Sequence, residues 1–415
     1  MKRVLLLLPT ASYRNEDFLA AAKRLEIEVI GVANYCHQLA PGWGKSPIQS
    51  VPFDQPVAAL KQLLTALGRK PDAVLAVDDS GLDLAALLCE YFNLPGNAPE
   101  AVRQTRDKLA FRNLLRRGGL RCPDFCHLDS DTQEPKLPPP LAFPVVVKAR
   151  RLGASRGVIR ADTPHAYAQA VQWVRSIQAK ADRDAVALGL VVENFIPGRE
   201  YALEGLLQDG RLRVLALFDK PDPLDGPYFE ETLYLTPSRL AQDKQDEIAQ
   251  AVQRACTLAG LERGPIHAEM RVNAEGVWLL EIAARSIGGL CGRMLRHALG
   301  MSLEELILRD ALNLPLPEVK HAASSGVMMI PIPQHGIFHG VRGIDQALEL
   351  AGISDIQITA SPGQLIAPPP AGASYLGFIF AQGASPDAVE SSLRKAQQQL
   401  VFDIQADIPV SETRA

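Results

Sequence analysis

Two hydrophobic periods alternate over residues 1–97 of the chain. Short apolar runs (VLLLLP, EVIGVAN and DAVLAVDD) are typical of buried parallel strands, and each is followed by a stretch with helical spacing (EDFLAAAKRL, PVAALKQLLTALG and LDLAALLCEYF). This alternation predicts a small, doubly wound, Rossmann-like α/β domain. Ligands of such sheets lie at the carboxyl ends of strands, here Pro9 to Ser12 and Asp78 to Gly81. No G-x-G-x-x-G follows the first strand, which argues against a dinucleotide site there.

The pattern changes after residue 97 and mixes both periods. Residues 97–122 predict a single helix with a Gly-Gly exit, and the Pro-rich segment SDTQEPKLPPPL predicts a loop before a new folding unit. From residue 143, a strand, a glycine-bearing loop, a helix and further strands predict an α+β region. After a break at LPLPEVK, residues 320–415 combine strands (GVMMIPIP, YLGFIFAQG) with helices (IDQALELAG, SPDAVESSLRKAQQQL) and predict a C-terminal α+β domain.

Composition narrows the class of protein. The chain has 415 residues, of which 47% are hydrophobic and 22% charged, so we expect a globular protein of several domains. A net charge of −4 without blocks of like charge argues against nucleic acid as a partner, and no apolar run is long enough to span a membrane. The scattered cysteines favour a reduced, cytoplasmic protein, and the apolar run after Met1 is too short for a signal peptide.

A hairpin is predicted within residues 264–293, where apolar and polar positions alternate on either side of Asn-Ala-Glu-Gly. A three-residue loop ending in glycine suits such a turn, since its last residue must take positive φ. This loop places Asn273 opposite Val277 and, counting back, Glu269 opposite Glu281. Side chains at such positions lie about 4.5–5.5 Å apart at Cβ on one face of the sheet.

Two carboxylates at that distance repel each other unless one is protonated or a cation lies between them. A hard, oxygen-preferring cation such as Mg²⁺ satisfies the pair. The alternative is that Arg271 and Arg285 neutralise the pair as a solvated charge lattice, and the hairpin alone does not decide between the two.

A glycine-bearing loop follows the predicted strand FPVVVKA, which ends near Lys148. The loop contains Gly153, Ser155 and Gly157, whose backbone N–H groups can surround a polyphosphate while the lysine supplies countercharge. A basic surface loop is the alternative. The same residues also fit G-x-S-x-G, but this loop is too long and basic for the nucleophile elbow of a hydrolase.

A strand in VVENFIPGREYALEG breaks at Pro197-Gly198 and resumes, with Glu193 and Glu200 on either side. Unpaired backbone beside carboxylates offers what an adenine edge and ribose hydroxyls need. An ordinary β-turn with surface glutamates is the alternative.

Order and spacing connect these stretches with a further one, TRDKLAFR, which contains Lys108. The series TRDKLAFR, VVVK with its glycine loop, ENFIPGRE and HAEM…LLEIAAR resembles the ATP-grasp superfamily of ADP-forming carboxylate–amine or carboxylate–thiol ligases. The resemblance covers residues 98–315. It implies an ATP-grasp fold of two α+β subdomains (about 123–192 and 193–315) with ATP between them, after a preATP-grasp domain at residues 1–97.

The resemblance also implies roles for particular residues. Glu269 and Glu281 would bind Mg²⁺ or Mn²⁺, and Arg285 and Lys148 would take part in catalysis, with Arg285 on the acyl-phosphate. The superfamily usually has E-x-N-x-R, whereas this chain has Ala283 in place of the asparagine, which leaves open whether one or two metal ions bind. The ATP-binding residues implied by the resemblance are Lys108, Lys148, Ser155, Gly157, Glu193, Ile196 and Glu200.

Within the superfamily the chain is similar to L-amino-acid ligases, the dipeptide-forming branch. The grounds are DKPDPLDGPYFEETLYLTPSRL before the hairpin, SIGG after Arg285, and YLGFIFAQG near the C-terminus. The similarity implies substrate contacts from Arg285, Glu231, His267, Gly288 and Gly289. A solvated loop is the alternative for Glu231, and a hydrogen-bonded core histidine is the alternative for His267.

The expected partners are therefore a small carboxylate and an amine, both of them amino acids in the main hypothesis. Two alternatives stay open: a ligase of another carboxylate–amine pair, as in purine-type metabolism, and an ATP-binding regulatory protein without catalysis. The identity of the substrates, a homodimer, and the role of residues 320–415 are also left open.

Overall fold

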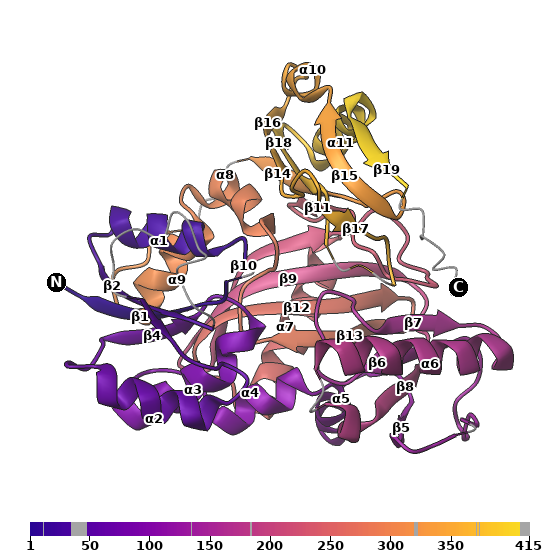
Figure 1. Ribbon diagram of the computed structural model, residues 1–415, viewed down its shortest axis with the longest axis horizontal. Coiled ribbons are helices and arrows are strands. Elements are labelled where there is room, and N and C mark those ends of the chain that lie inside the picture. Colours follow the sequence, from indigo (N-terminus) through magenta and orange to yellow (C-terminus); the bar gives the residue numbers. More distant parts are fainter. Residues whose placement is uncertain are drawn as a thin grey trace, which may run out of the picture. The chain divides into compact units, whose positions relative to one another are not determined.

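The computed structural model describes residues 1–10, 12–34, 48–133, 135–182, 185–318, 323–370, 372 and 374–406 (Figure 1). The chain divides into two compact units, each described separately below. The first unit contains Met1–His127, Ile196–Phe218 and Ser238–Ala322. The second unit contains Leu128–Phe195, Asp219–Pro237 and Ala323–Ala415. The domain boundaries proposed from the sequence, and the placement of ATP between two subdomains, stay predictions.

The first unit begins with the predicted α/β sheet. Its strands are parallel, in the order β3-β2-β1-β4. Figure 1 shows α1 on one face of this sheet and α2 and α3 on the other. The predicted strands and helices are confirmed, while β3 was not predicted because it is only three residues long. The bounds are β1 Arg3–Leu8, α1 Asn15–Arg24, β2 Glu28–Ala33, β3 Ile48–Ser50, α2 Pro56–Ala66, β4 Ala73–Ala76 and α3 Leu82–Phe92.

The single helix predicted over residues 97–122 is wrong, since two helices occupy this stretch. They are α4 (Pro99–Arg106) and α5 (Lys108–Arg117). Between them Asp107 has φ −96° and ψ 111°, and its carboxylate accepts the backbone N–H groups of Leu109 at 3.0 Å and Ala110 at 3.2 Å. A side chain that caps a helix start ends the preceding helix. Lys108 therefore opens α5 instead of lying within a longer helix.

An antiparallel sheet with the order β13-β12-β9-β10 forms the rest of the first unit. The even-numbered positions of β12 belong to an apolar core, in which Ala268 is joined by Ile248 and Val252 of α7. The odd-numbered positions face the other way, because side chains alternate along a strand. The bounds are β9 Arg199–Gln208, β10 Arg211–Asp219, α7 Gln242–Ala259, β12 Gly264–Asn273, β13 Gly276–Ala283, α8 Leu295–Leu299 and α9 Leu303–Ala311.

The second unit contains a sheet with neighbours β8-β6-β7, on which α6 packs, and a sheet with the order β11-β14-β18-β16, which carries α11. A small sheet, β17-β15-β19, completes it. The strands and helices predicted near the C-terminus are present, and β15, β16, β17 and β19 are additional. The bounds are β6 Val145–Ala149, β7 Val158–Ala161, α6 Pro164–Ala181, β8 Leu190–Asn194, β11 Leu233–Thr236, β14 Ser324–Ile330, β15 Gly336–Arg342, α10 Ile344–Leu348, β16 Ile353–Ile358, β17 Leu365–Ile366, β18 Gly377–Gly383, α11 Pro386–Gln399 and β19 Val401–Gln405.

The strand β5 (Phe125–Leu128) lies where the first segment of the first unit ends. Among the described residues, no helix combines the length and the apolar character needed to cross a membrane.

Candidate active site

The β12–β13 hairpin brings Glu269 directly opposite Glu281, as the sequence predicted, although the turn and the strand register differ from the prediction. The turn is one residue shorter than expected, since Asn273 pairs with Gly276 instead of Val277. A β-bulge between Glu269 and Met270 then shifts the register by one residue and restores the Glu269–Glu281 pair. The predicted positive φ of Gly276 is confirmed at 127°. A bulge leaves one residue unpaired and redirects the side chains beside it.

Two cationic side chains of α5 reach this bulge. Arg112 is fully buried and donates from Nη1 to the carbonyl oxygen of Leu280, the extra residue of the bulge, at 2.9 Å. Lys108, at the start of the same helix, holds its Nζ 3.7 Å from Oε2 of Glu281. The α5 helix therefore supports both the backbone and the charge of the second carboxylate.

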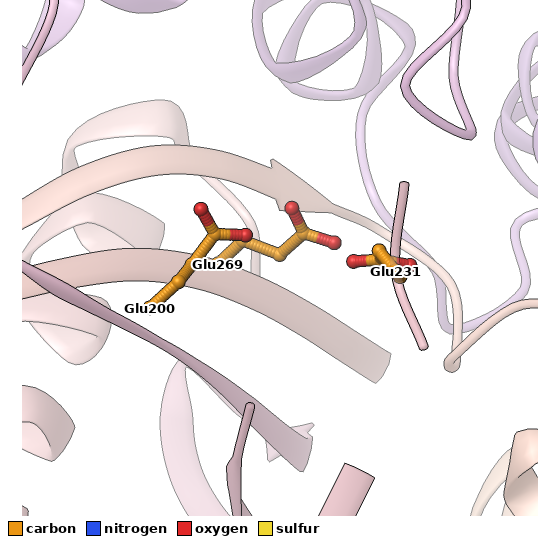
Figure 2. A group of neighbouring side chains, drawn as sticks. All are labelled: Glu200, Glu231 and Glu269. Atoms are coloured by element: carbon orange, nitrogen blue, oxygen red, sulfur yellow. The ribbon is translucent and has the colours of Figure 1, made fainter. Parts of the chain in front are cut away.

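Glu200 joins the same face from the neighbouring strand β9. Its position is opposite Arg271, and Arg271 Nε lies 3.2 Å from Glu200 Oε2 in a buried pair. Arg271 also donates to the carbonyl oxygen of Ile196 at 2.9 Å, at the break between β8 and β9. Figure 2 shows Glu200 and Glu269 on adjacent strands, and a carboxylate oxygen of one lies within 4.8 Å of an oxygen of the other.

This arrangement fits a divalent cation. Glu200, Glu269 and Glu281 offer hard carboxylate oxygens on a single face of one sheet, the donor set that Mg²⁺ prefers. The side chains of Glu269 and Glu281 are 26% and 33% exposed, so both are accessible to an ion from solvent. The arginines of the alternative reading have other partners: Arg271 contacts Glu200, and Arg285 contacts Asp79.

On the same face lies a buried pair, Glu204 and His267, of which the sequence analysis missed Glu204. Glu204 is fully buried, and its Oε2 lies 3.1 Å from Nδ1 of His267. The other ring nitrogen of His267 lies 3.4 Å from Oε1 of Glu269. Burial alone lowers the pKa of His267, but its hydrogen bonds with Glu204 and Glu269 outweigh this effect and raise the pKa to about 9. His267 thus lies buried between Glu204 and Glu269, a candidate metal ligand.

The segment after β13 is held by charged groups from the N-terminal sheet. Arg285 donates from Nε to Oδ2 of Asp79 at 2.9 Å, in the loop that the sequence marked at a strand's carboxyl end. Burial lowers the pKa of Arg285, but Asp79 and Glu281 together raise it, so the guanidinium stays charged. Buried Arg14 donates to the carbonyl oxygen of Val77 at 2.9 Å and to both the carbonyl and the hydroxyl of Ser286.

In the second unit, Lys148 of β6 forms an ion pair with Glu193 of β8, and both side chains are nearly inaccessible, at 9% and 2% exposed. The loop after β6 closes with a hydrogen bond from Ala149 N–H to Gly157 O at 2.8 Å. Gly157 has φ 63° and Ser155 has φ 54°, so the loop bends through left-handed conformations. Turns through such conformations also occur in anion-binding loops.

The segment PYFEE gives its two glutamates different surroundings. Glu231 forms an ion pair with Lys220 and accepts the hydroxyl of Tyr234 at 2.6 Å. Glu230 has a buried Oε1 to which no donor in the described part of the chain forms a hydrogen bond, and burial raises the pKa of its carboxyl group.

The structure therefore gathers part of the predicted set within each unit. The predicted residues of the first unit are Lys108, Ile196, Glu200, His267, Glu269, Glu281, Arg285, Gly288 and Gly289, the last with φ 58°. Those of the second unit are Lys148, Ser155, Gly157, Glu193 and Glu231. The residues that sequence reasoning missed are Arg14, Arg112 and Glu204. Of these, Glu204 could have been found from the sequence, because the two-residue period of a strand places it on the same face as Glu200.

Comparison with known families extends these observations. Residues 141–294 match the family model of the ATP-grasp domain, and residues 328–405 match the model of the L-amino acid ligase C-terminal domain 2. The structure is similar to a crystal structure of L-amino acid ligase from Bacillus licheniformis, with a TM-score of 0.79 and 25% identity over 98% of this chain and 99% of that chain. The predicted multidomain α/β and α+β fold is thereby confirmed.

The chain is also similar to curated proteins, over shorter stretches than to the crystal structure. Carnosine synthase 1 of Gallus gallus is 30% identical over 310 residues, which are 70% of this chain and 33% of the relative. Alanine–anticapsin ligase of Bacillus subtilis is 25% identical over 256 residues, 57% of this chain and 53% of the relative. The chain thus spans about a third of the carnosine synthase and about half of the anticapsin ligase.

Proposed function

We propose that this chain, which belongs to the ATP-grasp ligases and contains an L-amino acid ligase C-terminal domain, joins two amino acids at the expense of ATP, with ADP and phosphate as products. The observation that carries the proposal is the carboxylate face of β9, β12 and β13, where Glu269 and Glu281 stand opposite each other beside Lys108. Such a face serves phosphoryl transfer, which depends mainly on positioning and charge neutralisation.

The first step in this proposal is attack of a substrate carboxylate on the γ-phosphorus of ATP, which gives an acyl-phosphate and ADP. Lys108 and Lys148 would contact the phosphates, and the loop with Ser155 and Gly157 would cover them. Glu193, Ile196 and Glu200 would bind the adenosine part. The ion pair of Lys148 with Glu193 orders the lysine side chain.

In the second step the amine of the other amino acid attacks the acyl carbon, the amine loses a proton, and phosphate leaves. Arg285 would stabilise the negative charge that develops on the acyl and phosphoryl oxygens, since Asp79 holds its guanidinium in one orientation. Glu231, His267, Gly288 and Gly289 would contact the substrates. An acyl-phosphate is hydrolysed by water, so closure of the loop at residues 150–158 would protect it.

Glu269 and Glu281 would hold Mg²⁺, and Mn²⁺ has the same preference for oxygen ligands. When bound, the ion neutralises phosphate charge during the transfer. Ala283 lacks the oxygen that an asparagine would bring, so a second ion would depend on water and phosphate oxygens.

The experiment is a measurement of ADP and phosphate release by the full chain with MgATP and the twenty amino acids, singly and in all pairs. We expect release that requires a particular pair, with a dipeptide detected by mass spectrometry. Glu281→Ala should abolish release, and Glu275→Ala, which removes an exposed carboxylate from the adjoining turn, should leave it unchanged. Nucleotide binding without release for any pair would overturn the ligase proposal and favour the regulatory alternative.

A further inference from the structure

A pocket in the second unit has not been given a role above. Its open volume is about 430 Å³, which includes the solvent-filled space at its mouth. One wall is the glycine loop, through Ser155 and Arg156, and a second wall is formed by Tyr228, Phe229 and Glu230. The third wall consists of Pro369, Pro370, Gly372, Ser374 and Tyr375.

The fold holds the second wall firmly against the glycine-loop hairpin. Tyr228 forms an antiparallel bridge with Ile159 of β7, and the N–H of Arg160 donates to the carbonyl of Pro227 at 2.9 Å. Arg160 also donates to the carbonyl of Asp225 at 2.7 Å. These contacts hold residues 225–228 along the edge of the sheet beside β7. Tyr228 and Phe229 therefore lie next to the glycine loop.

Glu230 is the unusual feature of this wall. Among the described residues no donor reaches its buried Oε1, although a buried carboxylate oxygen is costly without a hydrogen bond. The neighbouring Glu231 shows the contrast, because Lys220 and Tyr234 satisfy it. Of these two adjacent glutamates, only Glu230 lines the pocket, and it is the one whose buried oxygen lacks a donor among the described residues.

The rest of the lining suits a cation. Tyr228, Phe229 and Tyr375 are aromatic, and aromatic faces attract ammonium and guanidinium groups. Phe229 stacks on Phe195 with ring centroids 6.4 Å apart, which orders it as a wall. Arg156 also lines the pocket, on the exposed tip of the glycine loop, and there it would meet the carboxylate or phosphate end of a ligand and not its cationic end.

We propose that this pocket binds the cationic side chain of an amino-acid substrate, with Glu230 as the counter-ion and the aromatic residues as its walls. The inference rests on the proposed ligase function and names a substrate class for it: amino acids with a side-chain ammonium, guanidinium or imidazolium group.

The test compares substrates that differ in charge but little in shape: arginine against citrulline, and lysine against norleucine. We expect kcat/KM for ADP release to be at least tenfold higher for the cationic member of each pair. Glu230→Gln should bring this ratio close to one. Equal kcat/KM values in the wild type would overturn the inference.

Two further variants separate binding from folding. Tyr228→Leu, which removes a partly exposed aromatic wall, should lower the preference for cations severalfold at an unchanged melting temperature. Glu349→Gln makes the same charge change at the exposed C-cap of α10. This control should leave the preference for cations intact. Loss of the preference in Glu349→Gln would show that net charge, and not the pocket, is responsible.

Calorimetric titration of the full chain with arginine and citrulline gives a second readout that needs no turnover. Selective binding of arginine that Glu230→Gln abolishes supports the pocket even if no pair of amino acids releases ADP, in which case the ligase proposal alone falls. Release of ADP with neutral amino acids, together with equal affinity for arginine and citrulline, would contradict the proposed cation-binding role of the pocket. The ligase proposal would not be affected by this result.

Discussion

Glu204 accepts the backbone N–H of Ile287 with both carboxylate oxygens, at 3.2 Å for Oε1 and 3.0 Å for Oε2. The same carboxylate contacts His267, which in turn contacts Glu269. Arg285 lies two residues before Ile287, so one fully buried side chain connects the loop of the candidate catalytic arginine with the candidate metal ligand. We infer that Glu204 is a positioning residue for both.

We expect Glu204→Ala to lower the free energy of unfolding by about 3–5 kcal/mol, because it removes one partner of a buried charged pair and leaves the other uncompensated. Glu204→Gln keeps an acceptor for the N–H of Ile287 and should cost less. Urea denaturation followed by circular dichroism measures both values. Glu262→Ala, at an exposed position before β12, is the control and should stay within about 0.5 kcal/mol of the wild type. A Glu204→Ala variant as stable as this control would contradict the assignment.

The sequence predicted the pair Glu269–Glu281 correctly although the predicted turn was wrong. Alternation of side chains fixes which residues share a face, and this depends only on local geometry. The bulge at Leu280 depends instead on Arg112 of α5, a residue far away in the chain, so no local pattern reveals it. The predicted turn was one residue too long, and the bulge was not predicted. Each error shifts the register by one residue, so the two cancel at Glu269 and Glu281.

Buried charges were the part of the site that sequence reasoning could not supply. Arg14 follows a polar loop and reads as a surface arginine, yet it is only 4% exposed and donates to Ser286. Glu204 lies in an otherwise apolar stretch of β9, where its burial depends on the later loop at Ile287. Periodicity could place Glu204 on the face of Glu200, but it does not reveal which distant segments contact these buried groups.

The bulge gives a prediction for Arg112. We expect Arg112→Leu to lower the free energy of unfolding by about 1–3 kcal/mol, because the carbonyl of Leu280 loses its buried donor. Since the bulge sets the position of Glu281, the Mg²⁺ concentration for half-maximal ADP release should rise severalfold. Arg117→Leu, an exposed arginine of the same helix, should change neither quantity. An unchanged Mg²⁺ requirement in Arg112→Leu would separate the bulge from the metal site.

The buried pair of Lys148 and Glu193 gives a prediction of non-additivity. Lys148→Met alone should lower the free energy of unfolding by about 3–5 kcal/mol, because Glu193 keeps a buried charge without its partner. Glu193→Gln alone leaves an unpaired lysine and should also be destabilising. The double variant should be more stable than the sum of the single losses predicts, by about 0.5–3 kcal/mol. Equilibrium denaturation of all four proteins completes the cycle, and strict additivity would mean that the two charges do not interact.

Burial of Cys256 in α7 gives a pH dependence. Burial raises the pKa of this thiol to about 12, so at alkaline pH the unfolded chain loses a proton that the folded chain keeps. Stability is thus present below the unfolded pKa of about 9 and falls as pH rises, by up to about 1.4 kcal/mol per pH unit. Relative to Cys256→Ala, the wild type should lose about 1.4 kcal/mol between pH 8 and pH 10 in urea denaturation. Parallel curves for the two proteins would contradict a buried, protonated thiol.

Gly198, at the break between β8 and β9, has φ 126°, and a Cβ built there would lie 2.5 Å from the carbonyl oxygen of Val272. Gly198→Ala therefore combines backbone strain with a clash against β12. We expect a loss of about 1–3 kcal/mol in the free energy of unfolding, together with a higher KM for ATP, because the break adjoins Ile196 and Glu200.

Gly210→Ala is the matched control: Gly210 also has positive φ, at 76°, but its Cβ would meet nothing within 4 Å. The control should show the strain without the clash and without a change in KM. Equal KM values for both variants would mean that the break does not contribute to nucleotide binding.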